Sequence, residues 1–336
     1  MRSHHPRRST AALTGTVVAT GVVAAGAALV GAPDLFGLAG HRPFVWTVPF
    51  RVPVGAGLAG AAVVAGAVGT RWRRVLPSAA ALALVAAGSV GTTLARGTAA
   101  GELPAARPGD VTVLAANVLK AQADPAGLAR LAVDGGADVV SLPESDQALA
   151  DDVAARIGSA TGTPVQVFWA RDLGGGGYGT ALLVSQSLGP YRTTGQLAGG
   201  VKAVVTAEPV SGEGPVLAAA HTAAPVPDLL GAWAVEVKAV ADWCANTPGS
   251  ILAGDLNATL DHPGLHLRGS CVDAGEQTGT GARGTWPAKY PAAVGATIDH
   301  ALADGNAWRA VGSSVRDIPG SDHRALLSRW RPVRSS

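Results

Sequence analysis

Three long runs without charged residues lie within the first hundred positions of the chain, at residues 11–32, 52–70 and 75–95. A helix of about 20 apolar residues is long enough to cross the hydrocarbon core of a bilayer. The runs are rich in Ala and Gly, whose small side chains allow helices to pack closely in a membrane. The sequence therefore predicts a membrane anchor over residues 1–100 with about three transmembrane helices.

Basic residues beside these runs predict how the anchor is oriented. Arg2, Arg7 and Arg8 precede the first run, and the segment RWRR at residues 71–74 separates the second run from the third. Because such charges stay in the cytoplasm, three spans place everything after residue 95 outside. We expect a multi-pass plasma-membrane protein with an extracytoplasmic body. A cleaved signal peptide is the alternative for the first run, and the other two runs would survive cleavage.

The composition changes after the anchor. Residues 101–110 are rich in Ala, Gly and Pro, which predicts a flexible linker before a globular body at residues 111–336. The first 100 residues hold nine Arg and one acidic residue, whereas residues 101–336 hold 17 Lys plus Arg and 23 Asp plus Glu. A surface that binds duplex nucleic acid is usually basic, so tight duplex binding is disfavoured. The cations that could line a cleft form no run: Arg268, Arg283, Lys289, Arg309 and Arg324.

The body contains two cysteines, Cys244 and Cys271. An extracytoplasmic location would permit a disulfide between them. Two buried free thiols are the alternative, and spacing alone does not decide between the two. Two cysteines without a CxxC pattern do not make a zinc site by themselves.

Short apolar runs alternate with helical periodicity along the body, with several consecutive strands in the middle. This mixture predicts a layered α/β domain with helices outside a sheet-rich core, not a pure βαβ repeat. The expected helices lie at residues 124–137, 146–161 and 229–247. The expected strands lie at residues 111–118, 138–142, 165–170, 180–185, 201–209, 214–222, 250–257, 296–304, 307–317 and 325–330.

Carboxylate, amide and imidazole side chains collect at the ends of these strands. An Asp or Asn after a strand is most often a turn former, and a lone His there is most often structural. Their number and chemical coherence nevertheless indicate one site, because active sites favour strand ends and the loops beyond them. The candidates are Asn117, Glu144, His221, Asp255, Asn257, Asp299, Asp322 and His323.

The segments AANVLK, DVVSLPES, AAAHTAAP, GDLNA, TIDHALA and GSDHRAL, in this order, resemble the endonuclease/exonuclease/phosphatase superfamily. GDLNA and SDHRAL are the most specific pieces, and the resemblance covers residues 111 to about 332. It implies a four-layer α/β sandwich, with two central sheets flanked by helices. Trp286, in GTWPA, matches a family segment and is expected to be structural.

The resemblance also implies a role for each candidate. Glu144 resembles the principal metal ligand, with Asn117 beside it and Asp322 as a second metal-side carboxylate. His323 resembles the catalytic base, and Asp299 the carboxylate that orients it. Asp255 and Asn257 match the Asp-x-Asn pair that positions the nucleophile and the scissile phosphate. His221 matches the His that steadies phosphate charge or aids the leaving group. The implied cofactor is Mg²⁺ or Mn²⁺.

These roles agree with the chemistry of phosphoester hydrolysis. Mg²⁺ prefers oxygen ligands and keeps several waters, so one or two carboxylates suffice to hold it. A His beside a carboxylate is a suitable base near neutral pH. Side chains at i and i+2 of a strand share a face, which suits two groups that bind one ligand. The glycines at residues 174–179 fit G-x-G-x-x-G, but a strand pattern follows where a dinucleotide site needs a helix.

The favoured hypothesis is a membrane-anchored, metal-dependent phosphodiesterase that acts as an extracytoplasmic nuclease. The alternative is a phospholipid or small-molecule phosphatase, or a phospholipase C-type enzyme, of the same fold. A non-catalytic surface binding domain is the third hypothesis, which the complete set of site residues disfavours. The expected partners are a phosphoester substrate, either nucleic acid or phospholipid, and a lipid bilayer; no obligate protein partner is indicated.

Overall fold

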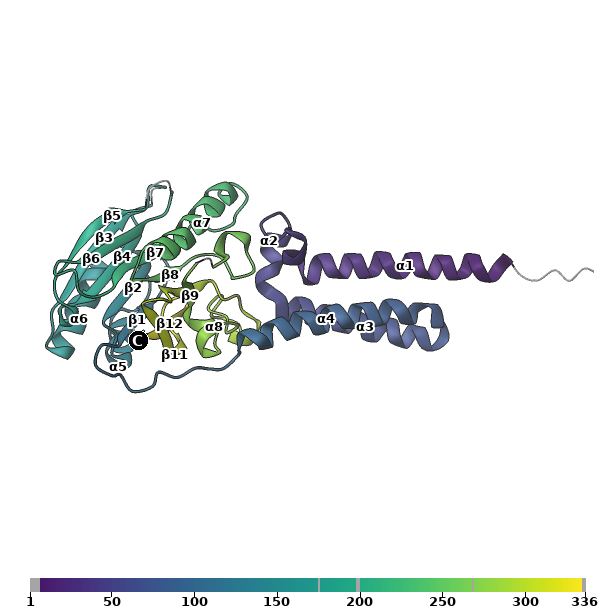
Figure 1. Cartoon of the computed structure of the whole chain (residues 1–336), viewed down its shortest axis with the longest axis horizontal. Coiled ribbons are helices and arrows are strands. Elements are labelled where there is room, and N and C mark those ends of the chain that lie inside the picture. The colour runs from purple at the N-terminus through teal and green to yellow at the C-terminus, as the bar shows by residue number, and fades with distance from the viewer. Residues whose placement is uncertain (1–6, 175, 198–199, 268, 334–336) are drawn as a thin grey trace, which may run out of the picture. The chain divides into compact units, whose positions relative to one another are not determined.

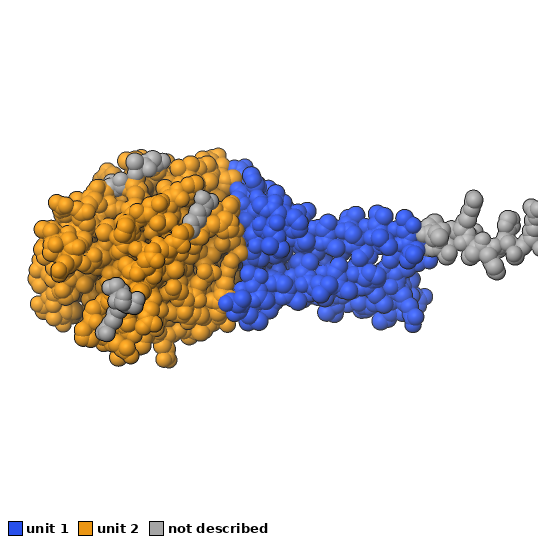
Figure 2. All heavy atoms as spheres, in the orientation of Figure 1, with its two compact units in different colours: residues 1–95 blue, residues 96–336 orange. Residues whose placement is uncertain are grey.

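Apolar helices form the first of two compact units in the computed structural model, which describes residues 7–174, 176–197, 200–267 and 269–333 (Figures 1 and 2). This unit covers residues 1–95, and the second covers residues 96–336. The long helices are α1 (Arg7–Gly31), α3 (Arg51–Arg71) and α4 (Leu76–Arg96). The short helices are η1 (Pro33–Phe36), α2 (Phe44–Thr47), η2 (Val48–Phe50) and η3 (Arg73–Val75).

Three segments of the first unit are long and apolar enough to cross a membrane: Leu13–Gly31, Phe44–Arg71 and Arg73–Arg96. Small residues bring α3 and α4 close together, since a Cβ added at Gly55 would lie 3.3 Å from the Cβ of Ser89. At the end of α1, the carbonyl of Gly31 accepts hydrogen bonds from Ser89 Oγ at 3.0 Å and Arg51 Nη1 at 3.3 Å. Three apolar helices therefore occur where the sequence predicts them.

The second unit is built on two six-stranded mixed sheets (Figure 1). The strand order is β11-β12-β1-β2-β4-β3 in one sheet and β5-β6-β7-β8-β10-β9 in the other. The first sheet contains β1 (Val111–Ala115), β2 (Val139–Ser145), β3 (Val165–Arg171), β4 (Gly179–Ser185), β11 (Trp308–Asp317) and β12 (Arg324–Pro332). The second contains β5 (Tyr191–Gln196), β6 (Val204–Pro209), β7 (Val216–His221), β8 (Ser250–Asp255), β9 (Cys271–Asp273) and β10 (Asp299–Asp304).

The apolar residues of the central strands fill two different layers because successive side chains point to opposite faces of a sheet. Val113 and Ala115 of β1 belong to the cluster between the sheets, together with residues of β7, β8 and β10. Leu114, between them, belongs to a second cluster with residues of two helices. Both faces of these strands are therefore buried, which explains their nearly continuous apolar sequence.

Helices cover the outer faces, which gives the four layers expected from the resemblance (Figure 1). The long helices are α5 (Pro125–Gly135), α6 (Gln147–Thr161) and α7 (Leu230–Asn246), and the short ones are η4 (Gln186–Leu188), η5 (Pro263–Leu265), α8 (Ala274–Thr278) and η6 (Ala292–Val294). Asp124 caps α5 by accepting hydrogen bonds from the N–H groups of Ala126 and Gly127, and Pro125 occupies the first turn. Helices α5 and α6 cover the first sheet, and α7 packs on the second.

The segment before β1 is attached to the second unit. Backbone hydrogen bonds join residues 96–99 to residues 279–282, and the Arg329 guanidinium binds the carbonyl of Pro104. Further along, Asp110 pairs with Arg331 at 2.7 Å. The segment expected to be a flexible linker is therefore held against the unit at both ends, a feature that its Ala, Gly and Pro content did not reveal.

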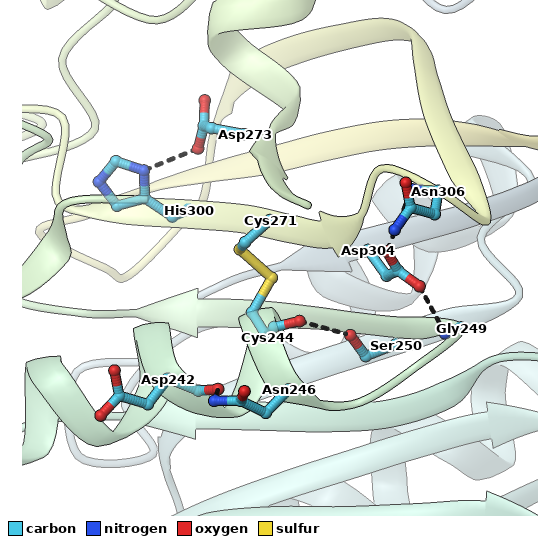
Figure 3. The surroundings of a disulfide bond; sticks show 10 residues. All are labelled: Asp242, Cys244, Asn246, Gly249, Ser250, Cys271, Asp273, His300, Asp304 and Asn306. Carbon is cyan, nitrogen blue, oxygen red and sulfur yellow. Dashed lines mark hydrogen bonds and ion pairs between the residues drawn. A yellow bond between two sulfur atoms is a disulfide. The ribbon is translucent and has the colours of Figure 1, made fainter. Parts of the chain in front are cut away.

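The two cysteines form a disulfide. It joins Cys244 of α7 to Cys271 of β9, with their Cα atoms 5.6 Å apart (Figure 3). The alternative of two free thiols is therefore excluded. The bond fastens the helix layer to the edge of the second sheet, beside the ion pair between Asp273 and His300 that Figure 3 also shows.

Candidate active site

Three candidate residues form one row across the second sheet. His221 ends β7, Asp255 ends β8 and Asp299 begins β10, and the strand register pairs His221 with Asp255 and Asp255 with Asp299. The parallel and antiparallel pairings therefore bring side chains that are far apart in the sequence to one end of the sheet. All three side chains are buried.

Asn117 and Glu144 come from the first sheet. The side-chain amide of Asn117 donates to Asp255 Oδ2 at 2.8 Å and to Glu144 Oε1 at 3.2 Å, so it links the two sheets. Glu144 lies inside β2, where the register with β4 shifts, and its φ is +60°. A left-handed conformation is uncommon for a residue with a side chain and costs about 1–3 kcal/mol. The irregularity turns this carboxylate toward Asn117.

The loop after Asn117 holds the Glu144 carboxylate. Leu119, Lys120 and Ala121 all have positive φ, and the N–H of Lys120 donates to Glu144 Oε2 at 3.1 Å. The N–H of Leu119 donates to Asn117 Oδ1 at 2.9 Å, which fixes the orientation of the amide. Glu144 keeps 22 % of its side chain exposed, so the carboxylate remains accessible to solvent.

The Asp-x-Asn pair lies on the loop after β8. The N–H of Asn257 donates to Asp255 Oδ1 at 2.8 Å, and its side-chain amide donates to the carbonyl of Thr222 at 2.9 Å. The carbonyl of Asn257 accepts from Trp233 Nε1 of α7 at 2.9 Å. The position of this amide therefore depends on both β7 and the outer helix.

His323 lies between two carboxylates. Its Nδ1 is 2.9 Å from Asp299 Oδ2, and its Nε2 is 3.7 Å from Asp255 Oδ2. Thr285 Oγ1 accepts a hydrogen bond from the N–H of Asp299 at 3.2 Å and so fixes the start of β10. Asp255, Asp299 and His323 also each offer an atom within 4.8 Å of the others, a spacing that a metal ion could use.

Asp322 faces a different neighbour from His323. Its Oδ2 accepts a hydrogen bond from Trp286 Nε1 at 3.0 Å, and the Trp286 ring lies 6.5 Å from the His323 ring. The other seven candidates are connected to one another by the contacts above or by the 3.9 Å between His221 Nε2 and Glu144 Oε1. Within the described part of the chain, Asp322 joins them only through its neighbour His323 and Trp286.

Burial and charge move the pKa values of these groups in different directions. Burial raises the pKa of Asp255 above its ordinary value, although His323 partly opposes this. Burial alone would lower the pKa of His323, but the carboxylates of Asp299 and Asp255 outweigh it and raise the pKa. Burial, aided by nearby Lys202, lowers the pKa of His221, so this imidazole is neutral at pH 7.

A family model supports the assignment that this geometry suggests. The model described as the endonuclease/exonuclease/phosphatase family matches residues 114–323. That range includes every candidate from Asn117 to His323. The chain belongs to the endonuclease/exonuclease/phosphatase family. Like the family, it is a hydrolase that acts on phosphoester bonds.

Solved structures share the fold of this family member. A humanized TDP2 of D. rerio is 17% identical with a TM-score of 0.51, covering 66% of this chain and 99% of the other. The endonuclease/exonuclease/phosphatase from Beutenbergia cavernae is 22% identical with a TM-score of 0.51, covering 67% and 72%. The human Nocturnin catalytic domain is 15% identical with a TM-score of 0.51, covering 69% and 97%. No curated protein matches the chain.

Sequence reasoning missed a cluster behind His221. Asp172 is buried at the end of β3, and its Oδ2 lies 2.7 Å from Lys202 Nζ and 4.0 Å from His221 Nδ1. The nitrogen Nδ1 of His221 is buried without a hydrogen-bond partner in the described structure. No sequence motif marks Asp172 or Lys202. Asp172 precedes the glycine-rich loop, and Lys202 lies in an irregular segment before β6.

Two other histidines serve the fold of this family member. His300, beside Asp299, faces away from the site and pairs through Nδ1 with Asp273 Oδ2 at 2.9 Å. Its Nε2 lies 3.0 Å from the carbonyl of Ala258, so both nitrogens face acceptors. His262 accepts at Nδ1 from the N–H of Thr259 at 2.9 Å, and its own N–H donates to the carbonyl of Thr259, so it closes a local turn.

The donor set fits a hard divalent cation. The Glu144 carboxylate supplies oxygen, the ligand atom that Mg²⁺ and Mn²⁺ prefer. The Asn117 oxygen already accepts from the N–H of Leu119, which leaves it one lone pair, and the NH₂ group of this amide faces Glu144. Glu144 and Asp322 are the partly exposed acids among the candidates, whereas Asp255 and Asp299 are buried. Enzymes of this family generally depend on divalent metals, and Asp255, Asp299 and His323 are a further group whose atoms lie close enough together to hold an ion.

Proposed function

We propose that the protein is a divalent-metal-dependent phosphoesterase held at the outer face of the cell membrane. One observation carries this proposal: His323 lies between Asp299 and Asp255, and Asn117 links Asp255 to Glu144. Such an arrangement brings a proton acceptor close to carboxylate and amide groups, the combination that phosphoester hydrolysis needs.

Each residue has a task in the proposed mechanism. Glu144 and Asn117, with Asp322 as the second acidic ligand, would hold Mg²⁺ or Mn²⁺, which polarises a phosphoryl oxygen. Asp299 binds Nδ1 of His323, so Nε2 is the atom that would take the proton of the attacking water. Because the nearby carboxylates raise the pKa of His323, the neutral imidazole that this step needs becomes more abundant as pH rises.

Asp255 and Asn257 would orient that water and the scissile phosphate. Neutral His221 would donate a hydrogen bond to the charge that develops on the phosphate, a contribution that a dry site strengthens. Asp255 Oδ2 lies 3.7 Å from His323 Nε2, beyond hydrogen-bond distance, so its effect on His323 is electrostatic.

The positions and partners of the cationic side chains in the catalytic unit indicate which class of substrate the site favours. Arg324 is buried, and its Nη2 donates to the carbonyls of Ala288 and Tyr290 at 2.7 and 2.6 Å, so it is not available to a substrate. Lys202 is paired with Asp172. Arg268 lies outside the described residues. This distribution of cations favours a small or lipid phosphoester, because a protein that binds a duplex needs many cations along the phosphate backbone. Nucleic acid, which the sequence favoured as the substrate, becomes the alternative.

The location rests on two features. Three apolar helices precede the catalytic unit, and RWRR lies between the second and third of them, which supports a location of the unit outside the cell. The Cys244–Cys271 disulfide supports the same side of the membrane, because such bonds persist in oxidising compartments.

A substrate panel tests the proposal. The full chain in detergent is given phosphorylated lipids, supercoiled plasmid and a chromogenic phosphodiester, each with Mg²⁺, Mn²⁺ or EDTA. We expect metal-dependent turnover of the lipid and chromogenic substrates. Plasmid nicking without lipid turnover would transfer the assignment to a nuclease. Absence of turnover for every substrate would contradict the proposed function, and a Glu144→Gln variant that keeps the metal requirement of the wild type would contradict the metal assignment.

A further inference from the structure

A buried carboxylate lies behind the His221 side of the site. Glu236 of α7 is 6 % exposed, and its partners are backbone N–H groups instead of a cation. Its Oε1 accepts from the N–H groups of Val201 and Lys202, and its Oε2 accepts from the N–H of Ala223 at 2.6 Å. One carboxylate thus joins two separate segments of backbone.

These segments flank the missed cluster. The β6–β7 ladder ends where Val204 pairs with Ala220, so the chain before Val204 and the chain after His221 lie beyond its last pair. Beyond the ladder, the Glu236 carboxylate accepts hydrogen bonds from the N–H groups of Lys202 and Ala223 and so connects the two segments. A Cβ at Gly200 would lie 2.8 Å from Glu236 Oε1, so the approach is close.

The same segments carry side chains that face the site. Lys202 Nζ binds Asp172 Oδ2 at 2.7 Å, and Asp172 Oδ1 accepts from the N–H of Ala203 at 2.9 Å. The N–H of His221 donates to the carbonyl of Ala203 at 3.3 Å. A movement of either segment would therefore move the His221 imidazole relative to Glu144, 3.9 Å away.

We infer that Glu236 is a positioning residue that fixes His221 against Glu144 and Lys202 against Asp172. The inference rests on the proposed phosphoesterase function. The physical basis of this inference is that an ionised carboxylate only accepts hydrogen bonds. Its two oxygens can therefore satisfy all three surrounding N–H groups. In Glu236→Gln the side-chain NH₂ must face at least one of these donors, so at least one backbone N–H loses its partner.

Asp304→Asn is the matched control. Asp304 is likewise 6 % exposed and accepts from the N–H groups of Gly249 and Asn306 at 2.9 and 3.0 Å. It ends β10, whereas Asp299 begins that strand at the active site. The two variants thus make the same chemical change, near the site and at the opposite end of the strand.

Kinetics on the chromogenic phosphodiester give the first test. We expect Glu236→Gln to lower kcat by about 10-fold or more with KM changed less than about 2-fold, because misplaced groups weaken the transition state. In a His221→Ala background the same change should add less than about 2-fold, since its effect passes through His221. A kcat equal to that of Asp304→Asn, or full additivity with His221→Ala, would overturn the inference.

Hydrogen exchange gives a test that does not depend on turnover. Measured by mass spectrometry on the full chain, exchange at residues 200–204 and 221–224 should rise in Glu236→Gln and stay at the wild-type level in Asp304→Asn. Unchanged exchange in Glu236→Gln would overturn the inference whatever the activity. An inactive wild type with raised exchange in the variant would instead contradict the proposed function and leave the positioning role supported.

Discussion

Asp322 and His323 are adjacent in the chain but have different partners. Consecutive side chains of an extended segment point in opposite directions, and here Asp322 accepts from Trp286 while His323 binds Asp299. The carboxylate that orients His323 therefore comes from 24 residues earlier in the chain. Asp322 and His323 therefore contribute to the site separately, although they are neighbours in the sequence.

Replacing His323 by Ala should lower kcat by at least about 100-fold, because a positioned base contributes roughly 10² to 10⁴ to the rate. The measurement is steady-state hydrolysis of the chromogenic phosphodiester with Mg²⁺. The control is His266→Ala, at an exposed loop position. Near-wild-type kcat in the His323 variant would remove this residue as the base.

All eight candidate site residues could be named from the sequence because short motifs mark them, and the structure connects seven of them directly. Their chemical roles remain predictions. Asp172, Lys202 and Glu236 could not be named, since they act on backbone N–H groups or on each other across long sequence separations. The positive φ of Glu144 was equally hidden, because a local pattern does not report a strained backbone.

At the scale of elements, the long helices and central strands followed from hydrophobic periodicity. Strand β5 was missed because its sequence, YRTTGQ, is polar and lies at the edge of the sheet. Strand β9 was missed because it has three residues and exists through its pairing with β10. Both are held by tertiary contacts that no local pattern contains.

The ion pair that joins β9 to β10 should make stability depend on pH. Burial alone would lower the pKa of His300, but the Asp273 carboxylate outweighs burial and raises it; Asp299 and Glu276 are the other charged groups nearby. The stabilisation is therefore complete below the unfolded-state pKa of about 6.5 and is lost as pH rises through the raised value.

We accordingly expect His300→Gln to lower the melting temperature more at about pH 6 than at about pH 10. Differential scanning fluorimetry of the full chain in detergent measures this, with His266→Gln as the control at an exposed position. An equal loss at both pH values would show that the charge of His300 contributes nothing to stability.

At the scale of the whole molecule, charge and hydropathy predict an apolar part followed by a catalytic body, and the structure has two compact units, residues 1–95 and 96–336. The disulfide was left open by the sequence, because only the fold brings α7 and β9 together. Attachment of residues 96–104 was also hidden, since Gly-rich and Pro-rich segments have the same composition whether they are free or packed.

Reporter fusions should locate the catalytic unit outside the cell. A phosphatase reporter that folds only outside the cytoplasm should be active when fused after Pro332 and inactive when fused after Trp72, between α3 and α4. A fluorescent protein that folds only in the cytoplasm should give the opposite pattern. Cytoplasmic signals from both positions would contradict the proposed orientation.

The attached segment before β1 also determines where the enzyme can be cut for work in solution. Arg96 binds Asp261 through two hydrogen bonds, of 2.7 and 2.8 Å, and the residues after it bind the backbone of residues 279–282. A soluble fragment designed to begin at β1 would discard these bonds and expose the surface beneath them. The smallest recombinant catalytic fragment worth expressing therefore begins at Arg96, not at the first strand.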